Sequence, residues 1–448
     1  MGNYIDLYKE KLRTADEAVK VVKSGDNVWY GHFAMAPRAL DEALAKRVGE
    51  LKDIWIKGVC ILFDPKVATA DPEHKSFTYH SGHFSGHDRH LGDKGLDFYL
   101  PGNYGQCPWN VRMGNYGPIS VAMIMATSPD ENGYFNFGTS CSYASLICET
   151  ADIVILEVND QVPWCLGGEQ ETIHISQVDY IVENHAPMIA FPSEFSVSEA
   201  EQKIASLIID QLEDGATLQF GIRAMPSMIG KMIAQTDLKD LGIHSEMMAD
   251  CFIDLEEKGI VTGTRKNIDR SKITYTFTLG SQNPYDFIDR NPVCATFPVD
   301  ITNSPARMAI NDKLMCINNA VEIDLFSQIN SESSGFRNIS GTGGQLDFTI
   351  GAMYSKGGKP FICLTSTKVQ KGQTVSRIVP TLSPGSIVTV PRTFAPYIVT
   401  EYGIVNMQGK STYRRAELLI EIAHPDFRDE LIKAAQQQGI WTRSNRID

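Results

Sequence analysis

Hydrophobic residues along this chain fall into two alternating patterns. Short, nearly continuous apolar runs, such as 27–31 (NVWYG) and 151–158 (ADIVILEV), are typical of buried strands. Between such runs, apolar residues recur at helical spacing, as in 39–48 (ALDEALAKRV) and 226–235 (PSMIGKMIAQ). This alternation predicts an α/β fold with mostly parallel sheets flanked by helices. Further strands are expected at 119–127, 217–221, 242–250, 359–367, 385–391 and 395–403.

A duplication relates the two halves of the chain. The segment SGDNVWYGHFAMAP resembles EDGATLQFGIRAMP, with Gly25 aligned to Gly215. Further along, ELKDIWIKG resembles DLKDLGIHS, with Asp53 aligned to Asp240. Two matches in the same order indicate an internal repeat of one α/β unit.

Each copy is preceded by a helix with a recognisable start. Thr14 with Glu17 and Ser198 with Glu201 have the spacing of a capping box. The segment APMIAFPSEFSVSE has the composition of a linker. We therefore expect two similar open α/β domains, 1–190 and 200–448, with the chemistry chiefly in the second.

Composition and charge narrow the classes of partner. Apolar residues make up 43% and charged residues 21%, as in soluble globular proteins. The formal net charge of -13 argues against nucleic acid or an anionic membrane as partner, because both require a basic surface. The nine cysteines form no C-x-x-C pair and the first residues show no apolar leader, so we expect a cytoplasmic protein without a disulfide framework.

The glycine turns are the first candidate sites. Gly221–Met225 (GIRAM) follows a predicted strand and precedes a predicted helix, where backbone N–H groups bind phosphates or oxyanions, although an ordinary turn has the same composition. The loop SGTGGQLDF contains Gly341, Gly343 and Gly344, but Leu346 stands where a dinucleotide fingerprint needs its third glycine. That loop is either a close approach to a bulky ligand or a tight turn. No P-loop motif occurs, so no ATP site is predicted.

Glu246 lies near the end of the predicted strand GIHSEMMAD, among apolar and small residues. Burial of a carboxylate disfavours its charged form, which makes the anion a stronger nucleophile. A salt-bridged or solvated glutamate is the alternative.

Half of the ten histidines lie in HKSFTYHSGHFSGHDRH, which holds His74, His80, His83, His87 and His90. Their spacing is compatible with a metal-dependent lyase or a metal-binding protein. Ser81, Gly82, Ser85 and Gly86 argue against a helix here, and no neighbouring Cys or H-E-x-x-H completes a ligand set. A loop that lines a pocket and a solvated loop are the other interpretations.

Several motifs together resemble a known family. LQFGIRAMP, LGIHSEMMADCFIDL, SGTGGQLDF, SRIVP and YIVTEYGI, with SPDENGYFNFG and EVNDQVP in the first half, are similar to family I CoA-transferases of the acetyl-CoA hydrolase/transferase type. The resemblance spans roughly residues 5–435 and is closest to the butyryl-CoA:acetate and 4-hydroxybutyrate branches.

The resemblance implies a cleft between two α/β domains, with Glu246 as nucleophile. The glutamate would attack an acyl-CoA thioester, form a mixed anhydride and then a glutamyl-CoA thioester, and react with an acceptor carboxylate in ping-pong order. The resemblance also implies that CoA contacts Gly221, Ile222, Arg223, Ala224, Met225, Gly341, Gly344 and Lys368. Coenzyme A would be the substrate, no tightly bound cofactor or metal is expected, and a homo-oligomer is expected.

One departure concerns the turn after Gly221. The family pattern is G-I-G, whereas this chain has Arg223 at the second glycine position. A side chain there disfavours positive φ, so Arg223 either reaches a CoA phosphate or the acyl carboxylate, or prevents turnover and leaves a CoA-binding protein. Transfer to 4-hydroxybutyrate and simple acyl-CoA hydrolysis remain alternatives to butyryl transfer.

Overall fold

A computed structural model describes residues 4–191, 197–221 and 224–440. The first half of the chain forms a seven-stranded sheet in the order β4-β3-β2-β1-β5-β7-β9, and every neighbouring pair is parallel. Its strands are β1 (Asn27–Tyr30), β2 (Ile54–Gly58), β3 (Phe77–Ser81), β4 (Phe98–Tyr99), β5 (Val121–Ala126), β7 (Ile153–Val158) and β9 (Tyr180–Glu183).

The second half forms an eight-stranded sheet in the order β15-β13-β11-β10-β16-β21-β25-β26. All its pairs are parallel except β25 with β26. Its strands are β10 (Thr217–Phe220), β11 (Gly242–His244), β13 (Ile273–Tyr275), β15 (Cys294–Thr296), β16 (Leu314–Asn319), β21 (Lys359–Cys363), β25 (Tyr397–Thr400) and β26 (Gly403–Asn406). The predicted α/β class with mostly parallel sheets is confirmed.

The duplication is visible in the strand orders. Let β10 be the counterpart of β1, and match the later strands of the two sheets in the order in which they follow along the chain. The first seven strands of the second sheet then lie in the same spatial order as the seven strands of the first. Asp53 and Asp240 both have a φ of 56°. The Gly25 N–H donates to Lys52 O at 3.0 Å, and the Gly215 N–H donates to Lys239 O at 2.9 Å. The repeat therefore preserves backbone conformation and hydrogen bonding as well as sequence.

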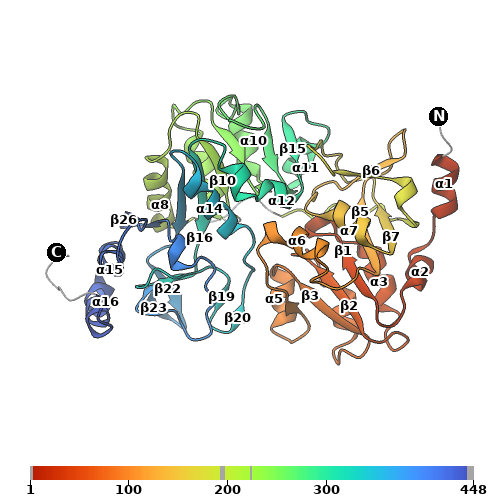
Figure 1. Ribbon diagram of the computed structural model, residues 1–448, viewed down its shortest axis with the longest axis horizontal. Coiled ribbons are helices and arrows are strands. Elements are labelled where there is room, and N and C mark those ends of the chain that lie inside the picture. Colours follow the sequence, from red (N-terminus) through yellow and green to blue (C-terminus); the bar gives the residue numbers. More distant parts are fainter. Residues whose placement is uncertain (1–3, 192–196, 222–223, 441–448) are drawn as a thin grey trace.

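Helices cover the sheets (Figure 1). In the first half they are α1 (Tyr4–Lys11), α2 (Ala15–Ala18), α3 (Arg38–Ala45), α4 (Lys66–Ala70), α5 (Gly86–Gly92), α6 (Cys107–Arg112) and α7 (Ala144–Thr150), with short 3-10 turns at Val19–Val21, Phe33–Met35, Tyr104–Gln106 and Ile175–Gln177. In the second half they are α8 (Glu199–Ile209), α9 (Ala224–Ile233), α10 (Asp250–Glu257), α11 (Gln282–Ile288), α12 (Val299–Thr302), α13 (Pro305–Met308), α14 (Gln345–Tyr354), α15 (Thr412–Glu421) and α16 (Pro425–Gln437), with a 3-10 turn at Arg392–Phe394. Both predicted capping boxes are present, at Thr14 and at Ser198. None of the helices in the described ranges has the length and apolar character that crossing a membrane requires.

Small accessory sheets complete the fold. They pair β6 (Tyr134–Asn136) with β8 (Thr172–His174), β12 (Met247–Met248) with β14 (Phe277–Thr278), β19 (Ser333–Ser334) with β20 (Arg337–Asn338), and β22 (Thr367–Gln370) with β23 (Gln373–Ser376). A three-stranded sheet has the order β18 (Ile329–Asn330), β17 (Glu322–Asp324) and β24 (Ile378–Val379).

Three local predictions were wrong. Segment 385–391 forms a single bridge at Val390 and no strand, because it begins with Gly385 at positive φ and ends at Pro391. The strand expected at 242–250 breaks after His244 and gives way to α10 at Asp250. The histidine-rich segment contains helix α5, since Ser85 caps it through a capping box with Asp88.

The two halves pack tightly against each other. The Thr278 N–H donates to Thr139 O at 2.8 Å, and the Val299 N–H donates to Ser142 O at 2.7 Å. One apolar cluster runs through both halves and includes Phe33 and Phe277. The junction is therefore a continuous core and not a hydrated gap. The domain limits 1–190 and 200–448 stay a prediction, and residues 192–196 at that boundary lie outside the described ranges.

Candidate active site

Glu246 lies just beyond the carboxyl end of β11, the edge at which open parallel sheets bind ligands. The Thr276 N–H donates to Glu246 O at 3.0 Å, so the residue is anchored through its backbone to the segment after β13. At the next residue, Met247, the chain resumes as β12, which pairs with β14. The break between β11 and β12 turns the Glu246 side chain out of the sheet ladder and toward the first half.

The Glu246 carboxylate is partly buried and held by two donors. The Asn303 Nδ2 amide donates to Oε2 at 2.6 Å, and a hydrogen bond comes from the backbone of Gly344. Gly344 precedes α14, so the positive end of that helix faces the carboxylate. The pKa of Glu246 is raised to about 7, mainly by burial and additionally by the nearby Asp347 charge, against the opposing hydrogen bonds from Asn303 and Gly344. A substantial fraction of the carboxylate is thus ionised near neutral pH while it is poorly solvated, which favours nucleophilic attack.

Glycine is needed at position 344 because the backbone there lies against the Glu246 carboxylate. A Cβ placed on it would lie 1.9 Å from Glu246 Oε2 and 2.3 Å from Asn303 Nδ2. Its neighbour Gly343 has a φ of 54°, which favours glycine. The glycine loop therefore approaches the Glu246 side chain closely, and its predicted approach to a bulky ligand stays a prediction.

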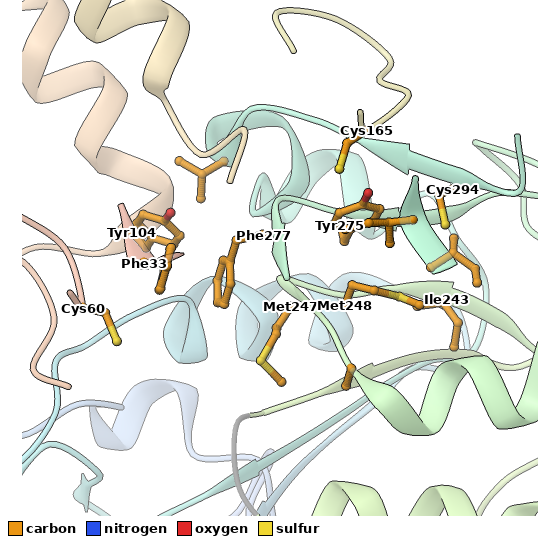
Figure 2. Close-up of a cluster of buried hydrophobic side chains, with 14 of the residues drawn as sticks. Phe33, Cys60, Tyr104, Cys165, Ile243, Met247, Met248, Tyr275, Phe277 and Cys294 are labelled. Carbon is orange, nitrogen blue, oxygen red and sulfur yellow. The ribbon is translucent and has the colours of Figure 1, made fainter. Parts of the chain in front are cut away.

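A narrow pocket adjoins Glu246. It lies between the halves of the chain and is lined by Phe33, Val59, Gly82, His83, Gly102, Tyr104, Cys107, Glu246, Phe277 and Gly343. Figure 2 shows Phe33 and Tyr104 of the first half facing Phe277 of the second. The Phe33 and Phe277 rings stack with centroids 3.9 Å apart. The wall beside the carboxylate is therefore mostly apolar.

A buried polar chain fixes one side of this cavity. The Tyr104 hydroxyl hydrogen-bonds to Ser142 Oγ, which also contacts His32 Nδ1 at 2.7 Å. Phe33 and Ser142 have φ values of 54° and 43°, and Cys60 beside the cavity has 50°. Left-handed non-glycine residues cost energy and gather at functional sites. Since the Tyr104 hydroxyl is occupied by Ser142, the ring presents carbon to the cavity.

The structure brings together some of the predicted site residues. Glu246 and Gly344 are in contact, and a Cβ on Gly341 would lie 2.9 Å from His83 Nδ1 across the junction. Gly221 directly follows β10, the strand beside β11, but it packs against Asn318 and is not among the residues that line the cavity.

The remaining residues predicted to contact CoA either do not line the cavity or lie outside the described ranges. Met225 is buried in α9, and Lys368 is half-buried on β22, away from the residues that line the cavity. Ala224 begins α9. Ile222 and Arg223 lie outside the described ranges. The role of each of these residues stays a prediction.

The histidines divide among several environments. His83 lines the cavity, which agrees with the pocket interpretation for that residue. His80 stacks on Trp55, His87 pairs with Asp64 at 2.8 Å, and His74 contacts Gly95 O at 2.9 Å. Over the described ranges, no three His, Cys, Asp or Glu side chains gather as metal ligands. The spacing of the histidines along the sequence does not bring them together as metal ligands, because β3 and α5 point these rings in different directions.

Sequence reasoning missed Asn303, Asp347, Phe33, Tyr104 and Phe277. Asn303 and Asp347 are 1% and 5% exposed, respectively, although both are polar. Asp347 belongs to the quoted motif SGTGGQLDF, so its acidic side chain one turn after a glycine loop was the available signal. Asn303 and the aromatic residues lie in unremarkable local sequence, and only folding places them beside Glu246.

Comparison with known proteins identifies the family. The acetyl-CoA hydrolase/transferase N-terminal domain matches residues 2–192, and the C-terminal domain of the same family matches 280–435. The chain is 50% identical to butyryl-CoA:acetate CoA-transferase from Anaerostipes caccae, over 99% of this chain and 100% of that protein. It is 48% identical to a probable butyrate:acetyl-CoA coenzyme A-transferase from Syntrophomonas wolfei, over 99% of each. The crystal structure of RipA from Yersinia pestis matches with a TM-score of 0.89 and 37% identity, over 98% of this chain and 100% of that one. The chain therefore belongs to the acetyl-CoA hydrolase/transferase family, as its motifs predicted.

Proposed function

We propose that the protein transfers coenzyme A between butyryl-CoA and acetate, with Glu246 as the covalent nucleophile. The observation that carries the proposal is a poorly solvated carboxylate at one end of an enclosed, largely apolar cavity. The two full-length relatives at 50% and 48% identity are named for this reaction, one of them as probable. A reaction between a carboxylate and a thioester needs no metal or nucleotide.

The reaction begins when Glu246 Oε attacks the thioester carbonyl carbon of butyryl-CoA. The C–S bond breaks, which leaves a mixed anhydride on Glu246 and free CoA thiolate. The thiolate then attacks the glutamyl carbonyl carbon, and the C–O bond to the butyryl group breaks. Butyrate leaves with the negative charge, and Glu246 carries CoA as a thioester. Acetate runs both steps in reverse and departs as acetyl-CoA.

Two donors are placed to stabilise the oxyanions of this sequence. Asn303 Nδ2 and the Gly344 backbone already bind the Glu246 carboxylate in the free enzyme. When the glutamyl carbonyl is attacked, one of its oxygens becomes an oxyanion at the same position, where preorganised donors are most effective. The donors therefore serve the second step without rearrangement.

The cavity favours an alkyl chain over a hydroxylated one. Phe33, Val59 and Phe277 present carbon, and the hydroxyl of Tyr104 is bound to Ser142. A terminal hydroxyl such as that of 4-hydroxybutyrate would lose hydrogen bonds to water on entering this wall. Butyryl transfer therefore takes precedence over 4-hydroxybutyrate transfer.

CoA binding extends the proposal to residues outside the cavity. We assign CoA contacts to Gly221, Ile222, Arg223, Ala224, Met225, Gly341, Gly344 and Lys368. Arg223 and Lys368 would offset a global charge of -13 at the phosphates of CoA. All nine cysteines are free and buried, which supports a reducing cytoplasm as the compartment.

Trapping the intermediate tests the proposal. Incubation with butyryl-CoA alone should yield a CoA adduct that borohydride or hydroxylamine removes, and Glu246→Ala should form none and lose exchange. Rates with butyrate, 4-hydroxybutyrate and acetate as acceptors should be lowest for 4-hydroxybutyrate. CoA release that is independent of added acetate would replace the transferase with a hydrolase, and exchange retained by Glu246→Ala would overturn the proposal.

A further inference from the structure

A second buried carboxyl lies behind the nucleophile. Asp347, in the first turn of α14, is 5% exposed and accepts a hydrogen bond from the Gly105 N–H at 3.2 Å. The Asn303 side chain also hydrogen-bonds to Asp347, while its Nδ2 donates to Glu246. One buried amide therefore lies between two carboxyls. Asn303 Oδ1 has no partner and is buried, so the amide is oriented by its donors alone.

The arrangement also joins the two halves of the chain. Gly105 belongs to the first half, and its neighbour Tyr104 donates its N–H to Gly343 O at 3.0 Å. A Cβ on Gly105 would lie 2.9 Å from Asp347 Oδ2 and 3.0 Å from Asn303 Cβ. Asp347 thus receives donors from both halves directly behind the reacting group.

We propose that Asp347 is a positioning residue that holds the Asn303 amide toward Glu246 and whose negative charge favours formation of the covalent CoA adduct. This inference rests on the proposed function. In the free enzyme two carboxylates face each other through one amide. In the adduct Glu246 is a neutral thioester, and its former charge has left with the product carboxylate. Like-charge repulsion is relieved by that step.

Protonation and thioester formation remove the same charge from Glu246. The repulsion by Asp347 therefore enters both equilibria with the same free energy. The pKa of Glu246 is raised by burial first and by the Asp347 charge in addition, and burial also raises the pKa of Asp347 to about 7. Removing the Asp347 charge should lower the pKa of Glu246, because its acid dissociation constant rises. The equilibrium ratio of adduct to free enzyme should fall by the same factor by which that constant rises.

Other ionisable groups around the two carboxyls come from four segments. His83 follows β3, Cys60 follows β2, Tyr104 is in a 3-10 turn and Cys107 begins α6. Burial raises the pKa of the Tyr104 hydroxyl and of both thiols, so these three stay neutral up to high pH. His83 is the remaining ionisable side chain on the cavity wall.

The test compares Asp347→Asn with Asp324→Asn in the full-length enzyme. Asp324 is a matched control because it is 1% exposed and burial raises its pKa. It lies on β17, in a different sheet, and accepts a hydrogen bond from Gln328. For Asp347→Asn, the acid limb of kcat/KM should shift down by about one pH unit, an ordinary effect of one neighbouring charge. At pH 8.5, intact-protein mass spectrometry at fixed butyryl-CoA and butyrate should show about tenfold less adduct relative to free enzyme. Asp324→Asn should change neither quantity.

Further variants separate a structural role from an electrostatic one. His83→Gln should leave the shift caused by Asp347→Asn in place, and Asp347→Glu, which keeps the charge, should restore most of the adduct. Asp347→Asn could lower kcat while the acid limb of kcat/KM and the ratio of adduct to free enzyme stay unchanged. In that case Asp347 has only a structural role, and the inference is overturned. Absence of any adduct in the wild-type enzyme would overturn the proposed function itself.

Discussion

Replacing Gly344 by alanine tests the geometry of the site most directly. The new Cβ would lie 1.9 Å from Glu246 Oε2, which is about 1.5 Å short of ordinary van der Waals contact. The φ of Gly344 is -98°, so alanine causes no backbone strain and the effect falls on the side chains it meets. A displacement of about 1 Å costs on the order of 100-fold in rate, equivalent to about 2.7 kcal/mol of activation free energy. We therefore expect Gly344→Ala to lower kcat/KM for butyryl-CoA by at least about 100-fold.

The assay measures acetyl-CoA formed from butyryl-CoA and acetate, together with thermal unfolding. Gly86→Ala is the matched control, because its Cβ would meet only Arg89 Nη2, at 3.6 Å, and activity should be unchanged. The melting temperature of Gly344→Ala should stay within a few degrees of the wild type, since the Glu246 carboxylate is partly exposed and can shift. Activity of Gly344→Ala within about threefold of wild type would refute the contact between α14 and the nucleophile.

Three other predictions follow from the same structure. Phe277→Ala removes one ring of the stacked pair, and the ratio of kcat/KM for hexanoyl-CoA to that for butyryl-CoA should rise about tenfold, whereas Phe336→Ala, at a 90% exposed position, should leave the ratio unchanged. Lys266 is 1% exposed, and burial lowers its pKa to about 7, so its unfolded state binds more protons above that pH. Chemical denaturation should therefore show the unfolding free energy of the wild type rising relative to Lys266→Met between pH 7 and 9, by up to about 1.4 kcal/mol per pH unit, and a flat difference would contradict the low pKa. Ser198→Ala removes the cap of α8 and should lower the unfolding free energy by about 1 kcal/mol in urea titrations, whereas no loss would show that the cap is dispensable.

Much of the fold was predictable because it follows from local rules. The capping boxes at Thr14 and Ser198 form as their spacing predicts. The repeated glycines, Gly25 and Gly215, both have positive φ, and the repeated aspartates, Asp53 and Asp240, share a φ of 56°, because backbone conformation there depends on a few neighbouring residues. Failures occurred where local signals competed, as at Ser85, where a helix cap was interpreted as a helix breaker.

The candidate site divides in the same way. Glu246 and the glycine loop at 341–344 carry signals in their own sequence, and the family resemblance added the chemistry. Asn303 and the pair Phe33 and Phe277 carry none that singles them out, and the signal at Asp347 is only its place in the motif SGTGGQLDF. Their importance arises from contacts between residues far apart in the chain, such as the 2.6 Å hydrogen bond from Asn303 to Glu246.

By itself, the sequence determined the α/β class, the duplication, the family and the proposed nucleophile, because each depends on periodicity or on short motifs. Tertiary structure alone decided which polar groups share the buried space around Glu246 and which carbon surfaces form the cavity. The physical reason is that desolvation and charge repulsion act through space. The raised pKa of Glu246 depends on Asp347 and on burial between two halves of the chain, and no local window of sequence contains that environment.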